Sequence, residues 1–249
     1  MSNKIIIIMK KLSLFTLGLI VFGSVMAGTI SCERNAGFGS DNGLPLLAVH
    51  NDGSTDFLVS NLELMINKAA PATAQDVELL KHMKEEEKLA RDVYVRLYEL
   101  WGVPVFANIS RSEERHLAAV NYLLSVYSPE DTVTAAPGRF NEGHFQELYD
   151  DLTGKGAESL AEALKTGATI EDLDIKDLQD YLALTENENI IMVFVNLMKG
   201  SRNHLRAFNR QLTMRGVSYE PQYIDQAAFE EIISTSVEQG RGYHGGRNR

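Results

Sequence analysis

The amino-acid sequence predicts an all-α protein, a four-helix bundle, and three observations lead to that fold class. Between Pro71 and Gly216, four long stretches repeat apolar residues at the three- and four-residue spacing of an amphipathic helix. No stretch shows the sustained apolar/polar alternation that is typical of a half-buried strand. The chain has 249 residues, 44% of them hydrophobic, which is enough for one core with appendages.

The first long helix is expected over residues 73–101. Thr73 and Asp76 have the spacing of a capping box, and Gly102-Val103-Pro104 ends the apolar repeat. The inward-facing residues of this stretch are Leu79, Leu80, Met83, Ala90, Val93, Tyr94 and Leu97.

The second helix is expected to begin at Asn108 or Ser110, since either residue can cap it, and to end at Ser128-Pro129. Its apolar face consists of Leu117, Val120, Leu123, Leu124 and Tyr127. A looped insert then runs to about Gly143, and a short extra helix over 144–152 precedes a break at Gly154 and Gly156.

The third helix is expected over residues 159–185 with one interruption at Gly167, and the fourth over 188–215 with Gly216 as its C-terminal cap. The bundle domain therefore occupies residues 73–220. It is expected to be a four-helix bundle with a short extra helix between its second and third long helices. Residues 221–249 form a C-terminal extension, whose Gly/Arg-rich end is expected to be disordered.

The first 32 residues are typical of a secretory signal, because lysines precede an uncharged apolar stretch from Leu12 to Ala27. Thr29-Ile30-Ser31-Cys32 resembles a bacterial lipobox, which predicts an exported lipoprotein with lipid on Cys32, in the periplasm or at the cell surface of a bacterial cell envelope. Plain secretion after cleavage at Val25-Met26-Ala27 and an uncleaved anchor are the alternatives. Residues 33–72, rich in Gly, Asn, Asp and Ser, are expected to form a linker with one short helix.

Charge and cysteine content exclude several classes of function. The formal net charge is -10, which argues against nucleic acid as a partner because phosphate binding needs a basic surface. Cys32 is the single cysteine, so neither an intrachain disulfide nor a thiolate zinc site can form. A metal ion bound by this chain must have oxygen and nitrogen ligands.

Two residues at the start of the second helix are candidate ligands. Glu113 and His116 are three positions apart and share a face that continues into Val120. The alternative is that Ser110 and Glu113 form a capping box, which would make Glu113 a surface residue. On the first helix Glu87 lies on the inward stripe, with its neighbour Glu86 as the second choice.

The third and fourth helices add further candidates. Glu171 and Asp174 lie on the inward stripe, whereas Asp172 and Asp177 are expected to face outward. A capping box of Thr169 and Asp172 is the alternative for this stretch. On the fourth helix His204 is in line with apolar core positions, where a lone histidine is often a hydrogen-bonded core residue.

Together the inward faces would present four carboxylates and two imidazoles. Converging carboxylates repel each other, and two divalent ions would balance their charge. Oxygen-rich coordination with imidazole favours iron, with manganese as the alternative, over zinc or calcium. The predicted ligands are Glu87, Glu113, His116, Glu171, Asp174 and His204.

Three stretches resemble the ferritin-like superfamily of di-iron carboxylate bundles, and most closely its branch called domain of unknown function 2202. They are "EEEKLARDVYVRLYELWGVPVFANISRSEERHLAAVNYLL", "EALKTGATIEDLDIKDL" and "NLMKGSRNHLRAFNRQL". The resemblance implies a Glu from the first helix, Glu-x-x-His from the second, a Glu from the third and Glu-x-x-His from the fourth. It favours Glu87 over Glu86, and Tyr94 or Tyr98 is expected near the centre. The fourth helix departs from this pattern, because Ser201 stands in place of the Glu. Asp174 would then have to supply the missing carboxylate.

The resemblance implies a di-iron oxidoreductase of ferroxidase or peroxidase type, with dioxygen or peroxide as the oxidant, and the first 32 residues predict that it is exported. Two alternatives are a metal-binding or sensing module without turnover, and a structural bundle in which the acids pair with Arg111, Arg115, Arg202 and Arg206. Membrane contact is expected only through the lipid anchor, and the oligomeric state is expected to be a monomer or homodimer rather than a cage.

Overall fold

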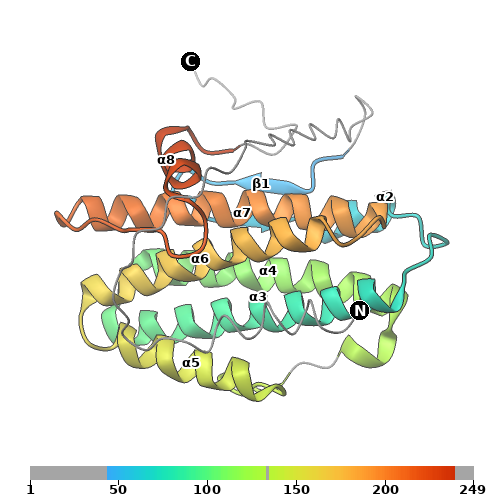
Figure 1. The fold of residues 1–249 in the computed structure, drawn as a ribbon, viewed down its shortest axis with the longest axis horizontal. Coiled ribbons are helices and arrows are strands. Elements are labelled where there is room, and N and C mark those ends of the chain that lie inside the picture. Colours follow the sequence, from blue (N-terminus) through green and yellow to red (C-terminus); the bar gives the residue numbers. More distant parts are fainter. Residues whose placement is uncertain (1–43, 133–134, 239–249) are drawn as a thin grey trace, which may run out of the picture. The chain divides into compact units, whose positions relative to one another are not determined.

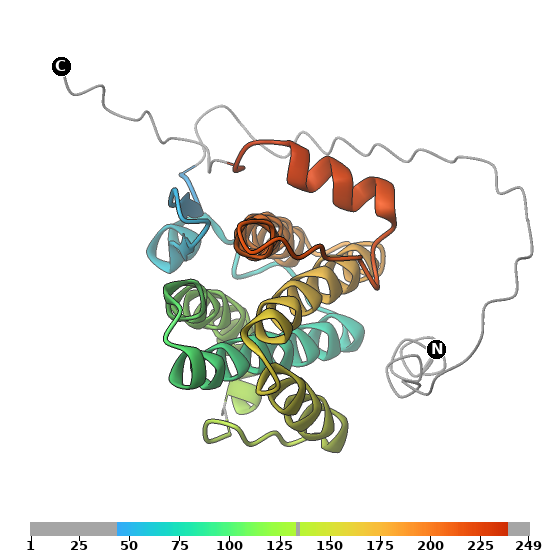
Figure 2. The ribbon, with the colours of Figure 1, turned by 90° about the vertical axis from the view of Figure 1, so that its left-hand side faces the viewer.

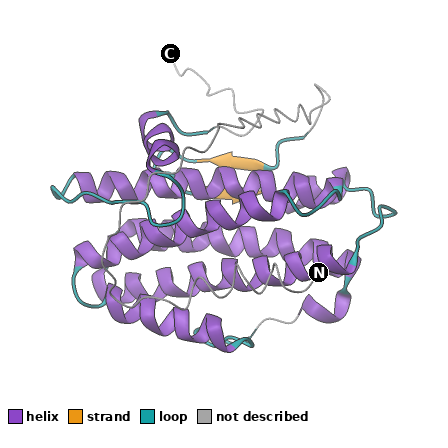
Figure 3. Ribbon diagram, in the orientation of Figure 1, coloured by secondary structure: helices purple, strands orange, loops and turns teal. Residues whose placement is uncertain are grey.

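A computed structural model describes residues 44–132 and 135–238 of the chain. The predictions of a signal segment, of lipidation at Cys32 and of a disordered end over 240–249 fall outside these residues. Within them the structure is an all-α bundle, as predicted, with one small pair of strands (Figures 1 and 3).

Four long helices form the bundle: α3 (Ala74–Trp101), α4 (Pro104–Tyr127), α6 (Leu160–Leu182) and α7 (Glu188–Thr213). The connections from α3 to α4 and from α6 to α7 are short, so each pair packs as a helical hairpin, and the two hairpins pack through α4 with α7 and α3 with α6 (Figure 2). The short extra helix is α5 (Gly143–Gly156), which packs against α3 and α6.

Local sequence signals explain several helix ends. Thr73 and Asp76 form the predicted capping box at the start of α3, and Gly102 closes that helix in the left-handed conformation with φ of 63°. The start of α4 differs from the prediction, because Pro104 at the first helical position, not Asn108 or Ser110, begins it. Helix α6 continues through Gly167 without the predicted interruption.

Within the predicted linker the expected short helix is present, but two strands before it were not predicted. Strands β1 (Leu47–Val49) and β2 (Thr55–Phe57) form an antiparallel hairpin in which Leu47 pairs with Phe57 and Val49 with Thr55. Helix α2 (Val59–Met65) follows. Strand β1 packs on α7 and β2 on α4, so the hairpin lies against both of these helices.

The remaining elements are the 3-10 helix η1 (Pro129–Thr132), which packs against α4, and α8 (Gln226–Ser234). Helix α8 belongs to the C-terminal extension and packs on α7 (Figure 2). Within the described ranges, no helix is long and apolar enough to cross a membrane.

The buried apolar residues form two clusters, one toward each end of the bundle. Along α3, Leu79 to Met83 belong to one cluster and Leu89 to Leu97 to the other, and charged residues lie between them. Helices α4 and α7 show the same division, and on α6 the change of cluster falls between Ile175 and Leu178. A polar layer therefore crosses the core where the two apolar clusters meet.

Candidate metal centre

The polar layer contains every predicted ligand. Their side chains come from all four long helices, and each residue is at most 6% exposed. They are Glu87 on α3, Glu113 and His116 on α4, Glu171 and Asp174 on α6, and His204 on α7. Ser110 and Glu113 lie well inside α4, so the alternative of a capping box that exposes Glu113 is excluded.

Two groups of three potential ligands share one carboxylate. The first group is Glu87, Glu113 and His116, and in it Nδ1 of His116 lies 2.9 Å from Oε2 of Glu113 and 3.3 Å from Oε2 of Glu87. In the second, Nδ1 of His204 lies 2.9 Å from Oε1 of Glu113 and 3.4 Å from Oε2 of Glu171. Within each group the ligand atoms are all within 4.8 Å of one another, which fits a site for one cation.

The ligand atoms in these groups lie close together, but several of them have no hydrogen-bond partner. Among the described residues, five of them have no hydrogen-bond partner despite full burial. They are Oε2 of Glu87, Oε1 of Glu113, Oε2 of Glu171 and Nδ1 of His116 and His204. Buried polar atoms are nearly always satisfied, so a set of unsatisfied atoms converging on two points fits the binding of two cations by oxygen and nitrogen ligands.

The residues of this layer have strongly shifted pKa values. Burial lowers the pKa of His116, but the charges of Glu87 and Glu113 outweigh burial and raise it to about 10. His204 behaves in the same way, and Glu113 and Glu171 raise its pKa to about 9. Both imidazoles are therefore protonated at neutral pH in the metal-free protein, where their charge takes the place of a cation's charge.

The carboxylates are shifted in both directions. Burial raises the pKa of Glu87 to about 8 and that of Glu171 to about 7, against the opposing charges of His116 and His204. Burial also acts to raise the pKa of Glu113, but the charges of both histidines outweigh it and hold this pKa well below the usual range. Glu113 is thus the ionised carboxylate at the middle of the layer, with one histidine at each oxygen.

Comparison with known proteins identifies the relatives of this chain. Residues 76–236 match the family described as uncharacterized protein domain DUF2202. The chain belongs to the DUF2202 family. A protein named Uncharacterized protein MJ0754, from Methanocaldococcus jannaschii, is 51% identical over 171 residues, which cover 68% of this chain and 92% of that protein.

A solved structure is similar to this one. The crystal structure of hypothetical protein MJ0754 from Methanococcus jannaschii has a TM-score of 0.66 and 51% identity, and the match covers 68% of this chain and 97% of the other. The family match spans α3 to α8, which includes every residue of the two ligand groups and leaves the strand hairpin outside.

The geometry distinguishes Glu87 from Glu86 as the ligand on α3. Glu87, not Glu86, belongs to a ligand group. The Glu86 carboxylate instead accepts a hydrogen bond from the Tyr181 hydroxyl at 3.0 Å and lies 3.0 Å from Nδ1 of His82. Glu86 thus belongs to a separate contact between α3 and α6.

The sixth predicted ligand, Asp174, and Ser201, which stands where the resemblance expects a Glu, do not complete the ligand set. Ser201 is buried, and its hydroxyl donates to the carbonyl of Leu197 within α7. Asp174 is buried in the same layer, where burial and then the charges of Glu171 and Glu87 raise its pKa well above the usual range. It is outside both ligand groups as they stand. The structure therefore brings five of the six predicted ligands into the two groups.

The prediction that Asp172 and Asp177 face outward is wrong, because both are buried: the segment over 222–224 covers Asp172, and Asp177 lies beside Glu86 of α3. Asp172 is fully buried and accepts hydrogen bonds from the backbone N–H groups of Gln222, Tyr223 and Ile224. It lies in mid-helix, which also excludes its role in a capping box with Thr169.

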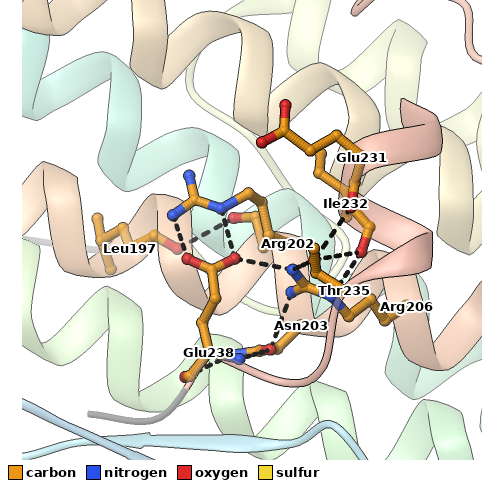
Figure 4. A network of polar contacts seen from close by, with 9 residues as sticks. Leu197, Arg202, Asn203, Arg206, Glu231, Ile232, Thr235 and Glu238 are labelled. Carbon is orange, nitrogen blue, oxygen red and sulfur yellow. Dashed lines mark hydrogen bonds and ion pairs between the residues drawn. The ribbon is translucent and has the colours of Figure 1, made fainter. Parts of the chain in front are cut away.

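The arginines of the purely structural alternative pair elsewhere. Arg202 and Arg206 both bind the carboxylate of Glu238 in the C-terminal extension, and Arg206 also donates to the carbonyl of Ile232 at the end of α8 (Figure 4). Arg111 donates to the side chain of Asn108. Arg115 lies 3.9 Å from the carboxylate of Asp56. None of these contacts reaches the buried carboxylates, which argues against a network of acids and arginines in the layer.

Two further residues contact the ligands. Of the two tyrosines expected near the centre, Tyr94 is fully buried and its hydroxyl donates to Oε1 of Glu171 at 2.6 Å, whereas Tyr98 is 43% exposed. Thr55 lies beside both histidines and was not foreseen. The Asp52-Gly53 pair, a hairpin-turn signal, could have revealed the strands, but nothing in the sequence links Thr55 to residues on α4 and α7.

Proposed function

We propose that this chain is a ferritin-like di-metal carboxylate protein that binds two ions, with iron favoured and manganese as the alternative. The observation that carries the proposal is the pair of ligand groups sharing Glu113, each with one histidine and one further carboxylate. A shared carboxylate with a Glu and a His on either side would suit two iron or manganese ions, because both metals accept mixed oxygen and nitrogen ligands.

The proposed activity is oxidation of ferrous iron coupled to reduction of dioxygen or peroxide. Two ferrous ions supply two electrons, which together with two protons convert one hydrogen peroxide into two water molecules. The chain's own contribution is to hold the ligands in a layer shielded from bulk water by the two apolar clusters. Tyr94 orients Glu171 through its hydrogen bond.

A second candidate is metal binding or sensing without turnover. The observation favouring it is Ser201, which stands where the resemblance expects a carboxylate and whose hydroxyl is engaged with Leu197. A centre with fewer anionic ligands stabilises ferric iron less than a centre with more of them. Such a centre would favour binding of ferrous iron without its oxidation.

Metal content tests the site itself. The chain would be produced with iron supplementation, and bound metal counted by mass spectrometry in the wild type and in Glu113→Gln. We expect two ions per wild-type chain and a loss of both in Glu113→Gln, because this one carboxylate serves both groups. Glu114→Gln is the matched control, since Glu114 is the exposed neighbour that pairs with Arg91. Equal metal content in all three proteins would refute the proposal.

Turnover then separates the two candidates. Ferrous oxidation followed by absorbance, with dioxygen or peroxide supplied, is expected to be catalytic in the wild type and absent in Glu113→Gln. Binding of two ions with no consumption of either oxidant would favour the sequestering or sensing function.

Export as a lipoprotein belongs to the same proposal and is supported by the sequence of residues 1–32 alone. Labelling with a fatty acid tests it: the wild type should incorporate the label and Cys32→Ser should not. Incorporation into both proteins, or neither, would contradict lipidation at this residue.

A further inference from the structure

One hydroxyl group contacts both histidines of the candidate centre from the side opposite the carboxylates. Oγ1 of Thr55 lies 3.0 Å from Nε2 of His116 and 3.1 Å from Nε2 of His204. Thr55 is 1% exposed and both histidines are fully buried. The histidines come from α4 and α7 of the bundle, whereas Thr55 comes from strand β2, outside the four helices.

The chemistry of imidazole determines what this contact does. Nδ1 of each ring faces the carboxylates, so metal binding would use Nδ1. A neutral imidazole that binds metal through Nδ1 carries its hydrogen on Nε2 and must donate it to an acceptor. A hydroxyl oxygen has two lone pairs and can accept two hydrogen bonds. The two rings are stacked at 19° with centroids 5.4 Å apart, which brings both Nε2 atoms to the one oxygen.

We infer that Thr55 is a positioning residue for the metal centre: its hydroxyl oxygen accepts a hydrogen bond from each histidine and holds both Nδ1 atoms toward the ligand groups. This inference rests on the proposed function, because the contact can affect metal affinity only if the centre binds metal. The hairpin, which lies outside the bundle, thereby completes the environment of the site.

The structure holds Thr55 in place from two sides. Its backbone N–H donates to Oγ of Ser112 on α4 at 2.8 Å. On the other side, Gly53 in the hairpin turn lies so close to α7 that a Cβ atom there would be 2.7 Å from Cβ of Ala207. Gly53 also has φ of 93°, which favours glycine. The turn therefore sits against α7 while the strand is tied to α4.

Loss of the hydroxyl would leave two buried N–H donors without an acceptor. Such donors are costly, and each ring could turn or change its tautomer to recover a partner. Removing an outer partner of metal-binding histidines commonly lowers metal affinity by about 10- to 100-fold. Because Thr55 contacts both rings, we expect both ions to be affected.

The test compares three variants of the full chain. Thr55→Val keeps the shape but removes the acceptor, Thr55→Ser keeps the acceptor, and Thr166→Val is the control. Thr166 is 2% exposed and its hydroxyl has no hydrogen-bond partner among the described residues, so the change removes a buried hydroxyl that binds nothing. Ferrous and manganous ion affinities would be measured by competition with a chelator, and the histidine Nε2 protons by nitrogen-15 NMR of the metal-free protein.

We expect Thr55→Val to bind both metals about 10- to 100-fold more weakly, with Thr55→Ser and Thr166→Val close to the wild type. In the metal-free protein, the slowly exchanging Nε2 protons of both histidines should be lost only in Thr55→Val. Unchanged affinity in Thr55→Val, with two ions bound to the wild type, would overturn the role of Thr55 and leave the proposed function intact. If the wild type bound no metal, the proposed function would fail, and unchanged Nε2 protons in Thr55→Val would then refute the hydrogen bonds themselves.

Discussion

Glu113 on α4 and His204 on α7 meet with Oε1 of the glutamate 2.9 Å from Nδ1 of the histidine. The other oxygen of the same carboxylate lies 2.9 Å from Nδ1 of His116, one helical turn further along α4. One side chain thus joins two ligand groups that otherwise share no residue. The two halves of the centre should therefore respond separately to substitution of their outer carboxylates.

Stoichiometry is the first prediction. Glu87→Gln and Glu171→Gln should each retain one of two ions, because each removes a ligand from only one group. Glu86→Gln is the control for the first change, since Glu86 neighbours Glu87 but contacts Tyr181 instead. Metal counting on the purified variants measures the effect. Loss of an ion in Glu86→Gln but not in Glu87→Gln would show that the ligand on α3 is misassigned.

The second prediction concerns Gly200, which lets His116 approach α7. A Cβ atom at this position would lie 2.6 Å from Cε1 and 2.8 Å from Nε2 of the His116 ring. The ring would have to move, so Gly200→Ala should lower metal affinity by about tenfold or more. Gly154→Ala is the control, because a Cβ there meets nothing within 4 Å. Equal affinity in both variants, measured by chelator competition, would contradict the tight contact.

The third prediction concerns stability rather than metal binding. Asp172 accepts hydrogen bonds from the N–H groups of Gln222, Tyr223 and Ile224, and it thereby ties the C-terminal extension to α6. Asp172→Asn replaces one acceptor oxygen by a donor and should lower the free energy of unfolding by about 2 to 3 kcal/mol. Asp151→Asn, on the exposed side of α5, should have no effect.

Urea denaturation measures this change, and metal counting should give the wild-type value in both variants. A midpoint for Asp172→Asn equal to that of the control would mean that these hydrogen bonds do not contribute to stability.

The fourth prediction is a dependence of stability on pH. Burial, and then the charge of Glu86, raises the pKa of Asp177 to about 9, with a smaller contribution from Asp180 and an opposing one from Lys176. The folded state therefore binds this proton more tightly than the unfolded state, where the pKa is about 3.9. The contribution to stability is complete below about pH 4 and is lost as the pH rises to about 9.

Asp177→Asn should remove this dependence, so its free energy of unfolding should fall less than that of the wild type between pH 5 and 9. Chemical denaturation at several pH values, in the presence of a chelator, provides the comparison. Parallel curves for the two proteins would contradict the raised pKa of Asp177.

Local patterns determined much of the fold and part of the site. The helices follow apolar spacing, Thr73 and Asp76 form the capping box, and the three-residue spacing of Glu113 and His116 puts both on one face of a helix. These features depend on residues within a few positions of each other, and such residues have a fixed relation once the helix forms.

Relations between distant segments were decided only by the tertiary structure. No sequence period connects Thr55 with His116 and His204, because the contact depends on where a strand hairpin docks across two helices. Asp172 was predicted to face solvent because the projection of a single helix cannot show that the segment over 219–224 covers its outer side. The sequence by itself determined that the six predicted ligands lie on the inward faces of the four helices. The packing of the four helices and the hairpin decided that Glu113 lies between the two histidines, because such distances are set by long-range packing.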